Sequence, residues 1–274
     1  MPAVTPSLFP PSDRVHYRRN PLVSVICQVR FSPILKIDVE PPAAFQESIR
    51  TEYPIMRDRS QEAIPLPVDL PEAVKGLVLR ASIGRARPQA AYDFASDDDR
   101  WTVSLTREFL SLATNRYERW EDFLARLEGP FAALVHNYSP AFSRIGLRYQ
   151  DLINPNALGL SGRPWADLLR PHMTGMLSAR DLDAAAITEN FSQSLIRLPV
   201  ANSSVAIRNG LVENERKEVC YLIDSDFFTE DKLEAERVKD VLNYFNQQSG
   251  RLFRWCTTEV LRNAMDPESL PELG

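Results

Sequence analysis

Two aspartates, Asp224 and Asp226, have the spacing in this 274-residue chain that comes nearest to a catalytic pattern. They lie two positions apart in YLIDSDFFTED, at the end of an expected strand, so both carboxylates can share one face and hold a divalent cation. The structural interpretation is favoured, because the same side chains can satisfy donors of a turn or helix cap. The segment is not a calcium loop, since Phe228 occupies a ligand position and Thr229 stands where glycine is needed.

Other catalytic signatures are missing from the sequence. The chain has no HExxH, CxxC, GxSxG, GxGxxG or GxxxxGK[ST] motif, and three histidines give little acid–base capacity near neutral pH. The chain has three cysteines, which are widely separated and lie within apolar patterns: Cys27, Cys220 and Cys256. We predict that they are buried and serve as small hydrophobic residues. We therefore expect no cofactor, and we lean towards a protein without catalytic activity.

Arg148 lies in SRIGLRYQDLINP, on an expected central strand. A buried arginine needs a partner, because an unpaired buried charge is very costly. We predict a structural ion pair with Asp122 or Asp240, on the two helices expected to pack nearby; Glu121 is a further candidate. A ligand-binding arginine and a solvent-exposed one are the alternatives.

Arginine-rich stretches are candidates for a surface that binds a partner. The net charge of −5 argues against a whole surface adapted to nucleic acid, although local basic clusters can still bind phosphate. Two stretches, RVHYRRN and RASIGRARP, supply the candidates, and solvated loops are the simpler interpretation: Arg14, Arg18, Arg19, Arg80, Arg85 and Arg87. The proline-broken loop from Ile64 to Pro71 is a further candidate for recognition.

Hydrophobic periodicity predicts the elements that position these residues. Leu22 to Phe31 alternates as a strand, and Glu118 to Tyr138 carries a helical stripe in which Gly129-Pro130 should cause a kink or a short break. The second half repeats the order, with strands in RIGLRYQDLI and FSQSLIRLPV and a helix from Glu230 to Gln248. A final helix is expected from Leu252 to Met265.

This repetition predicts an α+β fold of two similar units, each a mostly antiparallel sheet with a long helix on one face. WEDFLARL and VKDVLNYF match in their apolar positions, which suggests an internal duplication. The expected division is an N-terminal arm at 1–20, units at 21–140 and 141–266, and a frayed tail at 267–274.

The expected location is the cytoplasm, and no membrane partner is expected. No apolar run approaches the roughly 18 residues that cross a bilayer. The N-terminus MPAVTPSLFPPSD has no positive charge ahead of an apolar stretch, so it does not resemble a secretory signal.

Three motifs, PLVSVICQVRF, FLSLATNRYERWEDF and RIGLRYQDLI, together resemble a sporadically distributed family of uncharacterised bacterial proteins with no assigned activity. The resemblance covers about Asn20 to Met265, and its patchy distribution implies a horizontally transferred defence or toxin-linked module. We expect a non-catalytic binding or assembly protein whose partner is another protein, either a second copy or a different chain. The alternatives are a metal-dependent hydrolase or nuclease that uses carboxylates, and a nucleic-acid or nucleotide sensor.

Overall fold

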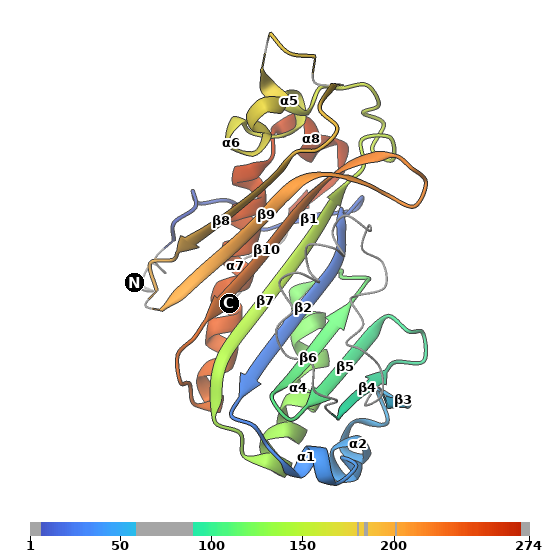
Figure 1. Cartoon of the computed structure of the whole chain (residues 1–274), viewed down its shortest axis with the longest axis vertical. Helices are drawn as coiled ribbons and strands as arrows, with labels where there is room; N and C mark the ends of the chain where they lie inside the picture. The colour runs from blue at the N-terminus through green and yellow to red at the C-terminus, as the bar shows by residue number, and fades with distance from the viewer. Residues whose placement is uncertain (1–6, 59–89, 180, 184–185, 201, 270–274) are drawn as a thin grey trace. The chain divides into compact units, whose positions relative to one another are not determined.

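The computed structural model describes residues 7–58, 90–179, 181–183, 186–200 and 202–269. The chain contains both helices and strands, as the predicted α+β class requires (Figure 1). The described strands are β1 Val15–Tyr17, β2 Leu22–Phe31, β3 Ile55–Asp58, β4 Ala91–Ala95, β5 Trp101–Thr106, β6 Phe109–Thr114, β7 Phe142–Ile153, β8 Phe191–Arg197, β9 Ser203–Glu213, β10 Val219–Thr229 and β11 Pro267–Ser269. The helices are α1 Lys36–Val39, α2 Ala43–Ile49, α4 Trp120–Tyr138, α5 Trp165–Leu168, α6 Pro171–Thr174, the 3-10 helix η1 Gly175–Ser178, α7 Ala235–Cys256 and α8 Glu259–Ala264.

The hydrogen-bonded order of the main described strands is β3-β4-β5-β6-β2-β7-β10-β9-β8, and β1 pairs with β11 separately. The pairs β3/β4, β4/β5, β5/β6, β2/β6 and β8/β9 are antiparallel. The chain forms two compact units whose segments interleave in sequence. One unit takes residues 24–147 and 228–242, and the other takes residues 1–23, 148–227 and 243–274.

The unit of residues 24–147 and 228–242 has its core between strands and helices α2 and α4. Helix α4 packs against β6, and aromatic rings of α2 and β4 meet where Phe45 lies 5.5 Å from Phe94. Trp120 and Phe123 of α4 are fully buried, as the helical stripe predicts. Leu124, which belongs to the same apolar stripe, is only half-buried. Helix α4 continues through Pro130, so the predicted break does not occur.

In the other unit, the part of α7 from Asn243 onward packs against the residues of β7 and β10 that belong to the same unit. The Tyr149 hydroxyl of β7 donates to Asn246 Oδ1 at 2.9 Å, and the Phe227 ring of β10 lies 6.2 Å from that of Phe245. Alternating residues of β7 therefore divide between the face that packs on α7 and the opposite face, which carries Arg148. Helices α5, α6 and α8 lie close together in the same unit (Figure 1).

Two predictions for the C-terminal part of the chain are wrong. Helix α7 begins at Ala235, after a bridge between Leu233 and Phe142, and runs to Cys256 instead of ending at Gln248. Gly250 does not stop it, because a glycine weakens a helix but can keep helical geometry. Residues Pro267–Ser269 pair with β1, although the sequence predicts a frayed tail there.

Candidate interaction site

The candidate site begins with a buried ion pair between neighbouring strands. Arg148 Nε and Nη2 donate to Asp224 Oδ1 and Oδ2 at 2.6 and 2.7 Å, a two-point contact that suits the planar guanidinium. The side chains are 19% and 2% exposed. Burial alone lowers the pKa of Arg148, but the hydrogen bonds and charge of Asp224 raise that pKa above its usual value. The arginine is therefore held charged.

A second arginine extends this pair towards the edge of the sheet. Arg208 Nη1 of β9 lies 3.5 Å from Asp224 Oδ2, so one carboxylate faces two guanidinium groups. On the next strand, Gln193 of β8 is the residue directly opposite Arg208. Directly opposed residues share a face of a sheet. Arg148, Asp224, Arg208 and Gln193 therefore form a polar row across β7, β10, β9 and β8.

Two further polar side chains of β7 lie close to this row in sequence. Gln150, two residues after Arg148 and on the same face, is fully buried, and neither amide atom has a hydrogen-bond partner among the described residues. Asp151 lies on the opposite face with Tyr149 and is 7% exposed. Burial, and then the charge of Asp224, raise the pKa of Asp151 to about 8. Its carboxyl group is therefore largely protonated at neutral pH.

The polar row ends at β8, the last strand in the order of the described sheet. Most of its side chains are exposed, and the large apolar ones include Phe191 at 50% and Leu195 at 68% exposure. Both are odd-numbered and lie on the face of Gln193, since Phe191 is opposite Gly210 and Leu195 is opposite Ala206. An apolar pair thus flanks Gln193 at this edge.

The glycine opposite Phe191 is required by a close approach of the chain. A Cβ at Gly210 would lie 2.0 Å from the Asn190 carbonyl oxygen, which accepts a hydrogen bond from the Leu211 amide. Such a distance is far below van der Waals contact, so a larger residue would displace the start of β8. Gly210 therefore helps to seat β8 against β9.

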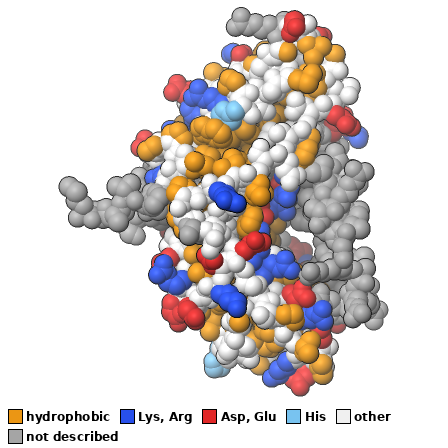
Figure 2. Space-filling model, turned by 60° about the vertical axis from the view of Figure 1, so that its left-hand side comes forward, with side chains coloured by type: hydrophobic (Ala, Val, Ile, Leu, Met, Phe, Trp, Pro, Cys, Tyr) orange, Lys and Arg blue, Asp and Glu red, His pale blue; other side chains and the backbone are white. Residues whose placement is uncertain are grey.

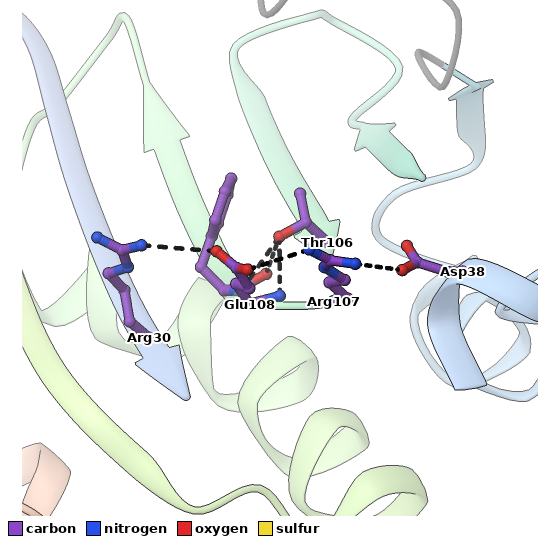
Figure 3. Close-up of polar contacts among 6 residues, drawn as sticks. Arg30, Asp38, Thr106, Arg107 and Glu108 are labelled. Atoms are coloured by element: carbon purple, nitrogen blue, oxygen red, sulfur yellow. Dashed lines mark hydrogen bonds and ion pairs between the residues drawn. The ribbon is translucent and has the colours of Figure 1, made fainter. Parts of the chain in front are cut away.

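The other unit contains an arginine network of a different kind. Arg107, in the turn between β5 and β6, lies 3.1 Å from Asp38 and 3.5 Å from Glu108, and Glu108 lies 3.8 Å from Arg30 (Figure 3). Thr106 Oγ1 accepts hydrogen bonds from the amides of the two residues that close the turn. The four charged side chains are 22–42% exposed. This network ties a turn to its surroundings at the surface.

The predicted ion pair of Arg148 is present, but its partner is Asp224 and not Asp122 or Asp240. Asp240 lies 3.6 Å from Arg237 on its own helix, and Asp122 is exposed. The prediction looked for a carboxylate on a packing helix, whereas the structure supplies one from a neighbouring strand. The sequence pattern places Asp224 at a strand end beside a turn, whereas it lies inside β10, next to β7.

The predicted metal candidates, Asp224 and Asp226, lie on β10 inside the strand. Both carboxylate oxygens of Asp224 accept hydrogen bonds from Arg148, and Asp226 also interacts with other residues. Within the described parts of the chain, no group of three or more His, Cys, Asp or Glu side chains is placed to hold a metal ion. The three cysteines are buried, as predicted, and burial raises the pKa of Cys27 to about 12.

The arginines of the predicted partner surface divide into two groups. Arg18 forms exposed ion pairs with Asp266 and Glu268, and Arg19 donates to main-chain carbonyls of Ala157, Leu158 and Ala264, so both hold the N-terminal segment in place. Arg14 also interacts with other residues. The remaining candidates lie outside the described residues, as does the loop from Ile64 to Pro71: Arg80, Arg85 and Arg87.

No protein-family model matches the chain, and no curated protein matches its sequence. This agrees with the resemblance to a family without an assigned activity. None of the helices in the described ranges is long and apolar enough to span a bilayer.

The sequence predicts a strand at β8 but does not single out its residues. The signal was available in FSQSLIR, where apolar residues at Phe191 and Leu195 are separated by three polar ones. A strand with one buried face alternates apolar and polar residues throughout. The departure from alternation in β8 indicates a strand with neither face fully buried, which agrees with the exposure of its side chains.

Proposed function

We propose that this protein is a binding or assembly protein that contacts another protein through the edge of β8. One observation carries the proposal: β8 is the last described strand of the sheet, and it exposes Phe191 and Leu195. An uncovered strand edge presents main-chain donors and acceptors in a row, and a partner strand can pair with them. Exposed apolar side chains beside that row add area that is buried when the partner binds.

The sequence of β8 lacks the features that usually protect an edge. Proteins discourage edge pairing with lysine, proline, bulges or inward-pointing charges. Phe191–Arg197 contains no proline or lysine, and its one charged residue is the last, Arg197. At the other end of the strand order, β3 has only four residues and carries Arg57 and Asp58. The contrast between the two terminal strands supports β8 as the contact site.

The view that brings the β8 side forward is consistent with a contact surface of mixed character. Figure 2 shows clusters of hydrophobic side chains among scattered acidic and basic ones on the described part of this face. Interfaces between proteins that also exist separately are commonly of this mixed kind, with apolar residues at the centre and polar residues around them.

Position-specific crosslinking tests the proposal. A photoreactive phenylalanine analogue is placed at Leu195 in the full chain inside the producing cell, and at Val39 of α1 as a matched control, since Val39 is an aliphatic residue with 78% exposure. We expect a crosslinked protein band of defined mass from Leu195 and not from Val39. No product from Leu195, or the same products from both positions, would overturn the proposal.

The alternative functions stay predictions with their own measurements. A carboxylate-dependent hydrolase requires bound metal in the purified protein and turnover that is lost in Asp226→Asn. A nucleic-acid sensor requires binding that weakens steeply as salt concentration rises.

A further inference from the structure

The β8 segment is complementary to itself. From Glu189 to Arg197 the sequence is ENFSQSLIR, with an acid at one end, a base at the other, and Gln193 at the centre. Phe191 and Leu195 stand at equal distances from Gln193, and a serine separates each from it. When such a segment pairs with a reversed copy of itself, Glu189 meets Arg197, Phe191 meets Leu195 and serine meets serine, while Asn190 meets Ile196.

The main-chain direction of β8 permits that pairing. The Asn190 carbonyl accepts a hydrogen bond from Leu211, and the Leu198 amide donates to Ser203, both at 2.9 Å and both towards β9. Main-chain groups of successive strand residues point to opposite sides, so even-numbered residues of β8 bond to β9. The odd-numbered residues, from Phe191 to Arg197, therefore direct their amide and carbonyl groups to the free edge.

We propose that the partner at this edge is a second copy of the chain, with the two β8 strands antiparallel about a twofold axis at Gln193. Phe191 then lies opposite the second copy's Leu195, and Glu189 lies opposite the second copy's Arg197. The same contacts occur twice, as a twofold interface requires. This names the partner of the proposed function and rests on that proposal.

Charge disfavours a parallel arrangement. In a parallel pair in the same register, Glu189 would face Glu189 and Arg197 would face Arg197, and like charges directly opposite each other destabilise a sheet. The antiparallel pair replaces these repulsions with two attractive pairs. Neither Glu189 nor Arg197 forms an ion pair with another described residue, so both charges are available to a partner.

The neighbouring antiparallel registers are less complementary. A shift that places the axis at Ser194 sets Phe191 opposite Arg197 and Glu189 opposite Pro199, which has no main-chain donor. A shift in the other direction, with the axis at Ser192, sets Glu189 opposite Leu195 and Phe191 opposite Gln193. Only the axis at Gln193 satisfies the apolar and charged pairs together.

The dimer should depend on concentration. One pair of nine-residue strands is small compared with the ~1,600 Å² buried in a standard interface. We therefore expect the purified full chain to shift from monomer to dimer as its concentration rises, as measured by sedimentation velocity.

Charge reversal tests the register. We expect Glu189→Arg alone and Arg197→Glu alone to weaken the dimer at least about tenfold, because each makes like charges face each other across the axis. An equimolar mixture of the two variants should associate again, since the two arginines of one variant then face the two glutamates of the other. The double variant E189R/R197E should also dimerise. Arg216→Glu, on the exposed turn after β9, is the matched control for loss of a positive charge.

Several results would overturn the inference. These are a chain that stays monomeric at every concentration, single variants that dimerise as the unsubstituted protein does, or a mixture that does not associate. Far-ultraviolet circular dichroism and melting temperature establish that each variant is folded. If the chain is monomeric but the photoreactive residue at position 195 still gives a specific crosslinked protein, self-pairing is refuted and the proposed function remains in place. If that crosslinked protein is also absent, both self-pairing and the proposed function are refuted.

Discussion

Two arginine networks in this protein use the same chemical groups in different surroundings. Arg148 contacts both oxygens of Asp224 between strands, where the carboxylate is 2% exposed. Arg107 contacts Asp38 and Glu108 at a turn, where the carboxylates are 25% and 22% exposed. Both networks join arginine to carboxylate at hydrogen-bonding distances, so burial is the main difference between them.

This difference determines what each pair contributes to stability. At the surface, water screens the charges, and an ion pair contributes little. In the interior, both groups have lost their water, so each depends on the other. The buried pair therefore specifies how β7 and β10 align, because a shifted register would leave two charges without partners. The surface network fixes a local turn.

The largest expected effect comes from removing the guanidinium of the buried pair. Arg148→Ala leaves Asp224 buried with only the 3.5 Å contact from Arg208, and should lower the free energy of unfolding by about 3–5 kcal/mol. Urea unfolding measures the change. Arg148→Lys is the control, since it keeps the charge but loses the two-point contact, and its loss should be smaller. A loss below about 1 kcal/mol in Arg148→Ala would remove the distinction between the networks.

The next effect concerns Asp151, the buried carboxyl near the first network. Its pKa is raised to about 8, by burial and then by Asp224, from an ordinary value of about 4. Above pH 4 the unfolded chain releases this proton while the folded chain retains it, so the folded state loses relative stability as pH rises. The slope is about 1.4 kcal/mol per pH unit, and it levels off above pH 8.

Asp151→Asn should remove this pH dependence, because the amide does not titrate. Between pH 5 and pH 7 the unsubstituted protein should lose about 2–3 kcal/mol relative to the variant. Urea unfolding of both proteins at the two pH values measures the difference, in which the contributions of other titrating groups cancel. Parallel pH profiles would show that the folded-state pKa of Asp151 is not raised.

The sequence predicts local elements well where one periodicity dominates. The strand from Leu22 to Phe31 has the predicted bounds, and helix α4 begins two residues after its expected start. Short-range patterns suffice in such segments, since alternation or a helical stripe follows from one buried face. The predicted helix break near Gln248 fails because the packing of α7 overrides the low helix propensity of Gly250.

The candidate site is less predictable because it depends on pairings between distant residues. Arg148 and Asp224 are 76 positions apart, and nothing in the local sequence of either indicates the other. The requirement that Arg148 have a partner follows from the cost of burying a charge, but the partner's identity follows from the strand order. The internal duplication stays a prediction for the same reason, since eight matched positions say nothing about how strands pair.

The smallest effect is expected at the exposed network. Arg107→Ala should change the free energy of unfolding by no more than about 1 kcal/mol, because its ion pairs are screened by water. Its Nε is buried and has no hydrogen-bond partner among the described residues, so the substitution also removes an unsatisfied donor and offsets part of the loss. The remaining difference should shrink in 1 M salt, where screening acts over ~3 Å. Urea unfolding at low and high salt measures it, with Arg148→Ala for comparison, whose loss should change little. A salt-independent loss at Arg107 as large as that at Arg148 would mean that burial is not what separates the two networks.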